Sequence, residues 1–331
     1  MYATGTTSKK PVWNFHPEIP LTYNPLCQWP LDLGKMVLWY VKIWLNISEI
    51  TIYVGLGIIA WMYLQPPMAI VETLGIDWIA QCYIRNFCLM LLVAGSLHLY
   101  FYTFNAQGHS LKFDARGLER NNKRFTFNNQ VWDNMFWTLA SGVTFWTAYE
   151  SVVLWNFANG TVSTITWSDS PIWFILLFLF IPAFSAIHFY AVHRLLHWPP
   201  LYKVAHALHH RNVSTGPWSG LSMHPLEHFI YLTSPFIHLA VPSHPIHVFF
   251  HFYFLTLAAA TSHTGYYGIF VAGKCRFRFG VFYHQLHHRF FECNYGNAEF
   301  PVDVFAGSFH DGTSQHDEKI RERRARKFGR T

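Results

Sequence analysis

The spacing of the histidines between positions 188 and 288 constrains the fold of this chain more than any other feature of its sequence. His193 and His197 are four residues apart, so a helix would place them on one face, one turn apart. The pattern His-x-x-His-His then occurs twice, at 206–210 and 284–288. A neutral imidazole is the commonest side-chain metal ligand and suits iron, copper, nickel and zinc. The sequence therefore predicts helical segments that converge on a histidine-only cage around two metal ions.

The remaining histidines have weaker spacing. His224 and His263 are isolated, and on spacing alone a structural role explains them as well as metal binding does. His247 and His251 are four apart, and this pair also stays open. For the others, a hydrogen-bonded core or interfacial position is the better interpretation: His188, His228, His238, His244, His310 and His316.

Composition decides whether the cage belongs to a soluble or a membrane protein. Of the 331 residues, 51% are hydrophobic, 19% are aromatic and only 13% are charged, against roughly 25% charged in a typical soluble domain. So few charges cannot coat a soluble globule of this size, which indicates a polytopic membrane protein. The net charge of +6 favours contact with anionic lipid headgroups. No basic stretch is interleaved with stacking aromatics, which argues against a nucleic-acid partner.

Four apolar segments are long enough to cross a bilayer, since a crossing needs about 20 residues. They lie at 36–64, 78–104, 131–157 and 171–191. The loop at 105–130 is basic, whereas the connections at 65–77 and 159–170 contain no Lys or Arg. By the positive-inside rule, this pattern places the N-terminus, the basic loop and everything from His193 onward on the cytoplasmic side.

Two shorter apolar stretches follow, at 226–240 and 247–260. Each is short for a complete crossing, so we interpret them as a re-entrant or interfacial hairpin against the metal site, with two further spans as the competing interpretation. The expected fold is all-α and polytopic, with about four transmembrane helices and a cytosolic helical metal domain. Its parts are a lead-in at 1–35, transmembrane helices within 36–191, the histidine region at 192–312 and a basic tail at 313–331.

A cage made only of imidazoles has a chemical consequence. Soluble di-iron bundles use carboxylates with two histidines, often in Glu-x-x-His pairs, and the histidine segments of this chain lack that pattern. Neutral ligands leave the bound metals more positive and more oxidising, which suits attack on an unactivated C–H bond. The oxygen chemistry belongs to the metal, while the protein supplies ligands, orientation and a dry pocket.

Five short segments carry a family resemblance: HRLLH at 193–197, HALHH at 206–210, HPLE at 224–227, HTGY at 263–266 and HQLHH at 284–288. In this order they resemble the histidine boxes of the membrane fatty acid hydroxylase/sterol desaturase superfamily. The stretch FFECNYG at 290–296 resembles the segment after the last box in sterol C5-desaturases. The run VDVFAGS at 302–308 departs from the family, because it keeps only Asp303 and the Gly-Ser end of the usual pattern.

The resemblance implies an O2-dependent oxidase with two iron ions, for which zinc can substitute in a purified sample. Electrons would come from NAD(P)H through cytochrome b5 or a ferredoxin-like carrier. The chain has no His-Pro-Gly-Gly haem motif, so the carrier is expected to be a separate protein. Carried over by position, the implied ligands are His193, His197, His206, His209, His210, His224, His263, His284, His287 and His288. No catalytic residue is expected beyond these ligands, and the residues expected to support them are Glu227, Asn294 and Asp303.

The leading hypothesis is an oxidase that desaturates or hydroxylates a C–H bond of a membrane lipid, with sterol C5-desaturation first. Fatty-acyl or alkyl-lipid hydroxylation and C4-methylsterol oxidation are the alternatives within this class. A membrane metal transporter is the alternative of another class. Transport predicts ionisable residues that line a path through the spans, and Arg85, Asp133 and Glu150 are not expected to line up. The expected location is the endoplasmic reticulum in a eukaryote or the cytoplasmic membrane in a bacterium.

Overall fold

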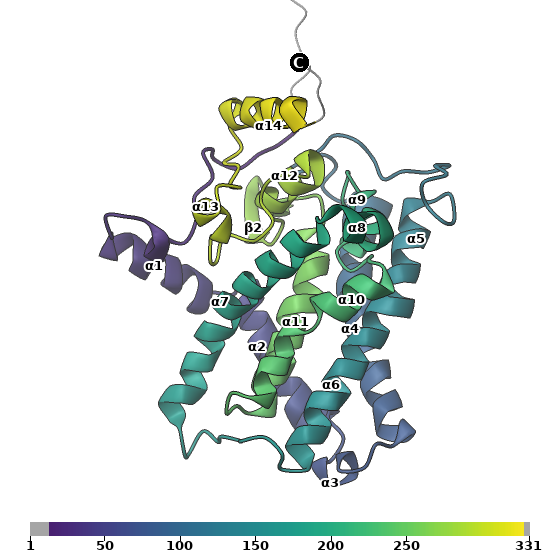
Figure 1. The fold of residues 1–331 in the computed structure, drawn as a ribbon, viewed down its shortest axis with the longest axis vertical. Coiled ribbons are helices and arrows are strands. Elements are labelled where there is room, and N and C mark those ends of the chain that lie inside the picture. Colours follow the sequence, from purple (N-terminus) through teal and green to yellow (C-terminus); the bar gives the residue numbers. More distant parts are fainter. Residues whose placement is uncertain (1–12, 328–331) are drawn as a thin grey trace, which may run out of the picture.

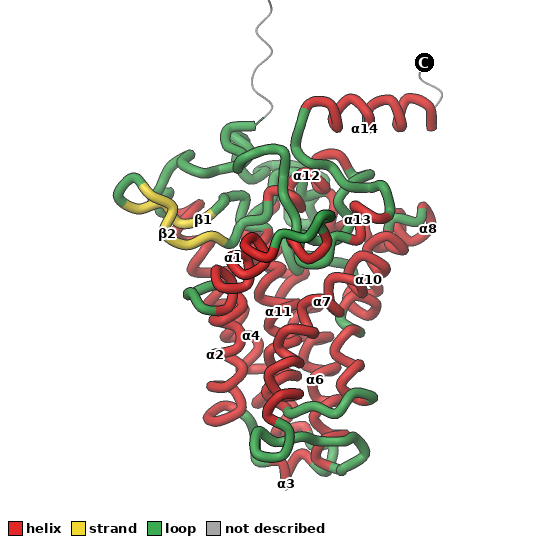
Figure 2. The backbone as a smooth tube through the Cα atoms, turned by 90° about the vertical axis from the view of Figure 1, so that its left-hand side faces the viewer, coloured by secondary structure: helices red, strands yellow, loops and turns green. Residues whose placement is uncertain are grey.

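Residues 13–327 are described by a computed structural model in which long helices run side by side and shorter helices and loops cap one end (Figures 1 and 2). The bundle consists of α2 (Glu49–Ile59), α4 (Ile76–His98), α5 (Gln130–Phe136), α6 (Val143–Ala158), α7 (Pro171–Leu196) and α11 (Pro245–Ser262). The cap holds α8 (Pro199–Leu201), α9 (Ala207–His210), α12 (Phe282–Phe290), α13 (Val302–Phe305) and α14 (Ser314–Lys327). The other helices are α1 (Leu33–Trp44), α3 (Met68–Val71) and α10 (Pro225–Tyr231).

The predicted helical class is confirmed. The one sheet within residues 13–327 is the antiparallel hairpin of β1 (Gly268–Val271) and β2 (Lys274–Arg278). Several long helices contain π-helical turns, and these extend α2 to Leu64, α4 to Thr103 and join α5 to α6. The helix that carries His193 ends at Leu196, and the chain restarts at Pro199 as α8.

Two helical segments of the described chain are long and apolar enough to cross a membrane, Ile76–Thr103 and Pro171–Leu196. A third candidate is the pair formed by α1 and Glu49–Leu64, which is bent by 41° at its break. The segment predicted at 131–157 forms a continuous helical run from α5 through α6, but it does not meet the same test of length and composition. The count of four spans therefore stays a prediction.

The loops lie at the two ends of the bundle, and their sides of a membrane stay a prediction. The basic loop lies at the cap, where the Phe113 carbonyl accepts a hydrogen bond from Asn14 N at 2.9 Å and Phe113 N donates to Gly265 O at 2.9 Å. The two connections without Lys or Arg meet at the opposite end, where Asn159 Nδ2 donates to Glu72 O at 3.0 Å. The segments predicted to share a side of the membrane thus share an end of the molecule.

The stretch predicted as a hairpin at 226–260 reaches the far end of the bundle and returns. Ser243 lies at the turn, where its carbonyl accepts from Ile165 N at 3.2 Å. The returning arm, α11, packs against α2, α4, α6 and α7, and its residues Phe249, Phe250 and Phe252 are fully buried. This arm is therefore the central helix of the bundle and not a peripheral, interfacial segment, and it ends at His263 beside the metal site.

A buried ion pair joins two bundle helices. Arg85 on α4 pairs with Glu150 on α6, and both side chains are almost fully buried, with 4% and 0% of their surface exposed. Trp146 Nε1 donates to the same carboxylate at 3.0 Å, and Asn86 Nδ2 does so at 3.2 Å. The expectation that Arg85 and Glu150 do not line up is therefore wrong. The third charged residue, Asp133, pairs instead with Arg211, which directly follows the histidines of α9.

Candidate metal centre

The histidines gather at the cap end of the bundle in two groups. Within each group, the ligand atoms all lie within 4.8 Å of one another. The first group is His193, His197, His206, His210 and His287, and the second is His209, His263, His284 and His288. All of the predicted ligands except His224 thus belong to one of the two groups. The groups are adjacent, since the ring centroids of His210 and His288 are 5.0 Å apart.

The two His-x-x-His-His segments divide their side chains between the groups. On the segment that ends α9, His206 and His210 face the first group and His209 faces the second. On α12 the division is reversed, because His284 and His288 face the second group and His287 faces the first. Residues four apart share a helix face, while the residue at i+3 is offset toward its edge. Each segment therefore contributes to both groups.

The distances between ring nitrogens fit a shared cation. In the second group, the Nε2 atoms of His263, His284 and His288 are each 3.1 Å from the other two. In the first group, His210 Nε2 is 3.0 Å from both His197 Nε2 and His287 Nε2. Two nitrogens that bind one cation at right angles, each about 2.1 Å from it, would be roughly 3.0 Å apart. The observed separations match this value.

The other ring nitrogen of several histidines is held by an acceptor. The Nδ1 atoms of His193 and His287 donate to the carbonyls of Tyr295 and Cys293, each at 2.6 Å. His263 Nδ1 donates to the Ala259 carbonyl at 2.8 Å. A proton fixed on Nδ1 leaves Nε2 unprotonated, so that its lone pair points into the cage. Lone pairs that face one another repel, and a bound cation would remove this repulsion.

Burial keeps these imidazoles neutral. It lowers the pKa of His209 to about 3 and holds the pKa values of His210 and His288 well below the ordinary value for histidine. His193 Nε2 is buried and has no hydrogen-bond partner. Neutral rings with free lone pairs are the form in which histidine binds iron or zinc, so the residues present fit a metal centre.

Glu227 contacts the cage directly. Its Oε1 atom is 2.7 Å from His206 Nδ1, and the carboxyl group is almost fully buried. Burial raises the pKa of Glu227 and lowers the pKa of His206, so in the absence of a cation this pair is disfavoured as two charges. A cation bound at His206 Nε2 would favour the carboxylate, because a ligating histidine commonly donates its other N–H to a carboxylate.

The other two predicted supporting residues act on the loop after α12. The buried Asp303 carboxylate accepts from Tyr295 N at 2.9 Å and from Gly296 N at 2.7 Å, and so fixes the carbonyl that holds His193. Asn294 adopts a positive φ of 52°, which asparagine tolerates better than most residues. Its side chain donates to the carbonyls of Tyr283 and His310. Both residues therefore shape the loop and do not touch the cage.

His224 lies outside both groups. It precedes α10, and its Nδ1 atom accepts a hydrogen bond from Leu226 N at 3.1 Å, which is the contact of a helix N-cap. Its role as a ligand stays a prediction of the family resemblance.

We expect His224→Asn to keep both metal content and stability, because asparagine is a good N-cap. His224→Ala should keep the metals and lose about 1 kcal/mol of stability with the cap. Metal analysis and thermal unfolding of the two purified variants check this. Loss of metal in both variants would instead make His224 a ligand.

Gly220 allows close packing behind the second group. A Cβ atom at this position would lie 1.9 Å from the Ala259 carbonyl oxygen, which holds His263. We expect Gly220→Ala to displace that carbonyl, to lower stability by about 1–3 kcal/mol through overpacking, and to reduce metal content. The matched control is Gly55→Ala, since a Cβ at Gly55 meets nothing within 4 Å. Equal unfolding temperatures and metal contents for the two variants would contradict the expectation.

The histidines interpreted as structural, and the pair His247 and His251 that spacing left open, form hydrogen-bond networks away from the cage. His251 contacts Ser185 and Ser234 at 2.9 Å and His238 at 3.1 Å. His228 contacts Ser141 at 2.9 Å, and His247 bonds the Phe174 carbonyl at 2.9 Å. A third group of His310, Asp311 and His316 has spacing for a metal. The Nδ1 atoms of its two histidines already accept backbone N–H groups, which makes it a structural network.

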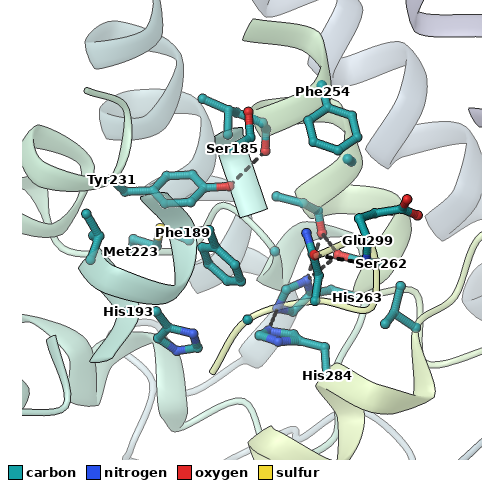
Figure 3. Close-up of a pocket in the computed structure, with 18 of the residues that line it drawn as sticks. Ser185, Phe189, His193, Met223, Tyr231, Phe254, Ser262, His263, His284 and Glu299 are labelled. Atoms are coloured by element: carbon teal, nitrogen blue, oxygen red, sulfur yellow. Dashed lines mark hydrogen bonds between the residues drawn. The ribbon is translucent and has the colours of Figure 1, made fainter. Parts of the chain in front are cut away.

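A cavity of about 250 Å³ opens onto the cage. Figure 3 shows His193, His263 and His284 along its lower side, with Phe189, Tyr231 and Phe254 above them. Most of the lining is apolar and comes from α2, α7, α10 and α11. The exceptions away from the histidines include two glutamates, Glu49 and Glu299. The sequence gives no sign of this cavity, because its lining comes from segments far apart in the chain.

Comparison with known proteins finds similarity over the part of the chain that holds the site. Residues 174–308 match the family model described as fatty acid hydroxylase. The chain is 30% identical to the Delta(7)-sterol 5(6)-desaturase of Saccharomyces cerevisiae over 135 residues, which is 40% of this chain and 36% of the relative. A Delta(7)-sterol 5(6)-desaturase of Aspergillus fumigatus is 32% identical over 143 residues, or 42% of this chain and 39% of the relative.

A plant relative extends the similarity. The Delta(7)-sterol-C5(6)-desaturase of Nicotiana tabacum is 28% identical over 170 residues, which is 50% of this chain and 60% of the relative. The chain thus spans between about a third and three fifths of the length of these curated relatives. No solved structure matches the chain.

Proposed function

We propose that this protein is a membrane desaturase that introduces the C5(6) double bond of a sterol. The match of residues 174–308 to the fatty acid hydroxylase family model, together with the similarity to sterol 5(6)-desaturases, supports an oxidoreductase of the sterol desaturase-like superfamily. The single observation that carries the proposal is the pair of adjacent histidine groups at the end of an apolar cavity. The similarity to sterol 5(6)-desaturases favours a sterol over an acyl chain as the substrate.

In this proposal the two groups hold two iron ions. Bound iron would supply the activation of O2 and the electron transfer that removal of hydrogen from a C–H bond requires. The ligands would be the histidines of the two groups, with Glu227 and the carbonyls of Tyr295, Cys293 and Ala259 fixing the orientation of the rings. Such outer contacts commonly change metal affinity by about 10–100-fold when they are removed.

The cavity would bind the lipid and exclude water. Phe189, Met223 and Leu255 offer an apolar surface to the rigid body of the substrate, and Phe189 stacks on His193 with ring centroids 4.9 Å apart. This contact places apolar lining directly against the cage. A reacting C–H bond held within about an ångström of its proper place gains much of the rate enhancement that orientation provides.

We further propose the topology that the charge pattern predicts, with four crossings and the metal centre on the cytoplasmic side. Support comes from the basic loop and the cage sharing one end of the molecule. On the same cap, α14 exposes several basic residues, namely Lys319, Arg321, Arg323 and Arg326. A basic cap favours approach of an acidic, separate electron carrier such as cytochrome b5 or a ferredoxin-like protein.

The decisive experiment is a sterol analysis of yeast cells that lack their own sterol 5(6)-desaturase. Cells that express this protein should accumulate a sterol two mass units lighter than its precursor, and cells with the empty vector should not. A product sixteen units heavier would show hydroxylation instead, and a mass change confined to acyl lipids would support the fatty-acyl alternative. Unchanged lipids despite a metal-loaded, membrane-inserted protein would overturn the proposal.

A further inference from the structure

The cavity has a polar side that the proposed chemistry does not use. Glu49 and Glu299 both line it, Glu49 from the first turn of α2 and Glu299 from the loop that follows α12. In Figure 3, Glu299 and Ser262 lie to the right of the cavity, while Ser185 and Tyr231 lie at its upper left and the histidines below. The two carboxyl groups are close enough to interact electrostatically.

Glu49 and Glu299 differ in how they are held. Tyr53 Oη donates to Glu49 Oε1 at 3.0 Å and contacts Thr261 Oγ1 at 3.1 Å, so α2 and α11 fix this carboxyl group together. For Glu299, the backbone is fixed, since its carbonyl accepts from Asn24 Nδ2 at 2.9 Å and its N–H donates to Asn297 Oδ1 at 3.1 Å. Among the described residues, however, no hydrogen bond or ion pair reaches the Glu299 carboxyl group. The side chain is half-buried and lines the cavity, so its carboxyl group is open to a ligand bound there.

The charge of the cavity restricts what can bind. No lysine or arginine is among the described residues that line it. At this side of the cavity an anionic head, such as a free fatty acid or a phosphate, would meet two carboxyl groups and no lysine or arginine, in a region of low dielectric where repulsion is strong. A neutral hydroxyl has no such penalty. Burial raises the pKa of Glu299 to about 7, and a hydroxyl can donate to the carboxylate or accept from the carboxylic acid, so it suits both protonation states.

We infer that the cavity binds its substrate by a neutral hydroxyl group placed between the carboxyl groups of Glu49 and Glu299, and that the substrate class is a lipid alcohol. The inference rests on the proposed function only for the statement that the cavity is the substrate site. It deepens that function, since a sterol carries a single hydroxyl on an otherwise apolar body. It also separates sterols and fatty alcohols from free fatty acids, which share the apolar body but have an anionic head.

The test measures equilibrium binding to the purified full-length protein in lipid nanodiscs, with two matched pairs of probes. The first pair is a Δ7-sterol and the same sterol without its 3-hydroxyl, and the second is a C18 fatty alcohol and the corresponding fatty acid. We expect the hydroxyl to strengthen sterol binding by about ten-fold, as one hydrogen bond to a charged group does. Glu299→Leu should abolish this preference while metal content stays unchanged.

A control variant separates the effect of Glu299 from a general effect of replacing a glutamate. Glu72→Leu changes an exposed glutamate at the far end of the bundle and should bind as wild type does. If Glu299→Leu keeps the preference for hydroxyl, or if the fatty acid binds wild type more tightly than the alcohol, the inference is wrong even where the sterol is converted in cells. If hydroxyl dependence holds only for the fatty alcohol, the inference stands and the sterol proposal fails. Absence of binding by every probe overturns the inference.

Discussion

His209→Ala is expected to lose metal and to reduce lipid turnover more than about a hundred-fold, because even outer hydrogen-bond partners of metal ligands contribute roughly 10–100-fold. His209 is buried within the second group, and its Nδ1 donates to the Ser222 carbonyl at 3.3 Å. Its removal leaves three histidines in that group. The measurements are iron per chain by elemental analysis and the sterol product in cells.

The matched control is His188→Ala. His188 lies on α7, one turn and a half before His193, and its Nε2 contacts Thr233 Oγ1 at 2.9 Å, away from both groups. This variant should keep its iron and its activity. Full iron occupancy and normal turnover in His209→Ala would remove the basis for a catalytic metal centre at this place.

Glu150→Ala should produce the largest loss of stability. It leaves the Arg85 guanidinium buried without its carboxylate, and breaking one side of a buried ion pair costs about 3–5 kcal/mol. Trp146 and Asn86 also lose an acceptor. We expect a clear fall in the thermal unfolding temperature in detergent, with metal binding intact at temperatures at which the variant remains folded.

The double variant Arg85→Met/Glu150→Leu tests the cause. Replacing both charges with apolar side chains is commonly neutral or stabilising, so it should recover most of the lost stability. For comparison, Lys35→Ala removes an exposed pair with Asp32, in which the Lys35 and Asp32 side chains are 69% and 50% exposed, and should change stability by no more than about 1 kcal/mol. Equal effects of Glu150→Ala and Lys35→Ala would mean that the buried pair is not important for stability.

The parts of this molecule that could be predicted from the sequence are those encoded in local spacing. The i, i+3, i+4 pattern of His206, His209 and His210 gave the correct helical turn, and the pattern at 284–288 did the same. Because helical geometry fixes which side chains share a face, the convergence of most predicted ligands followed from spacing and family resemblance.

What could not be predicted depends on contacts between distant segments. The acceptors that orient His193, His287 and His263 are backbone carbonyls, which every residue has, so no residue type marks them. The pairing of Arg85 with Glu150 joins residues 65 positions apart. The sequence also did not indicate that α11 lies at the centre of the bundle. A helix that is apolar on all sides has the same sequence pattern whether lipid tails or other helices surround it.

The division of each His-x-x-His-His segment between the two groups has a consequence for the proposed loading with two iron ions. An ion that enters one group would order α9 and α12, and those same helices present the histidines of the other group. The second ion would then meet a site that is already arranged, so we expect it to bind more tightly than the first. Titration of the iron-free protein should therefore be steeper than for two independent sites, and chains that hold a single ion should be scarce at every stage of filling.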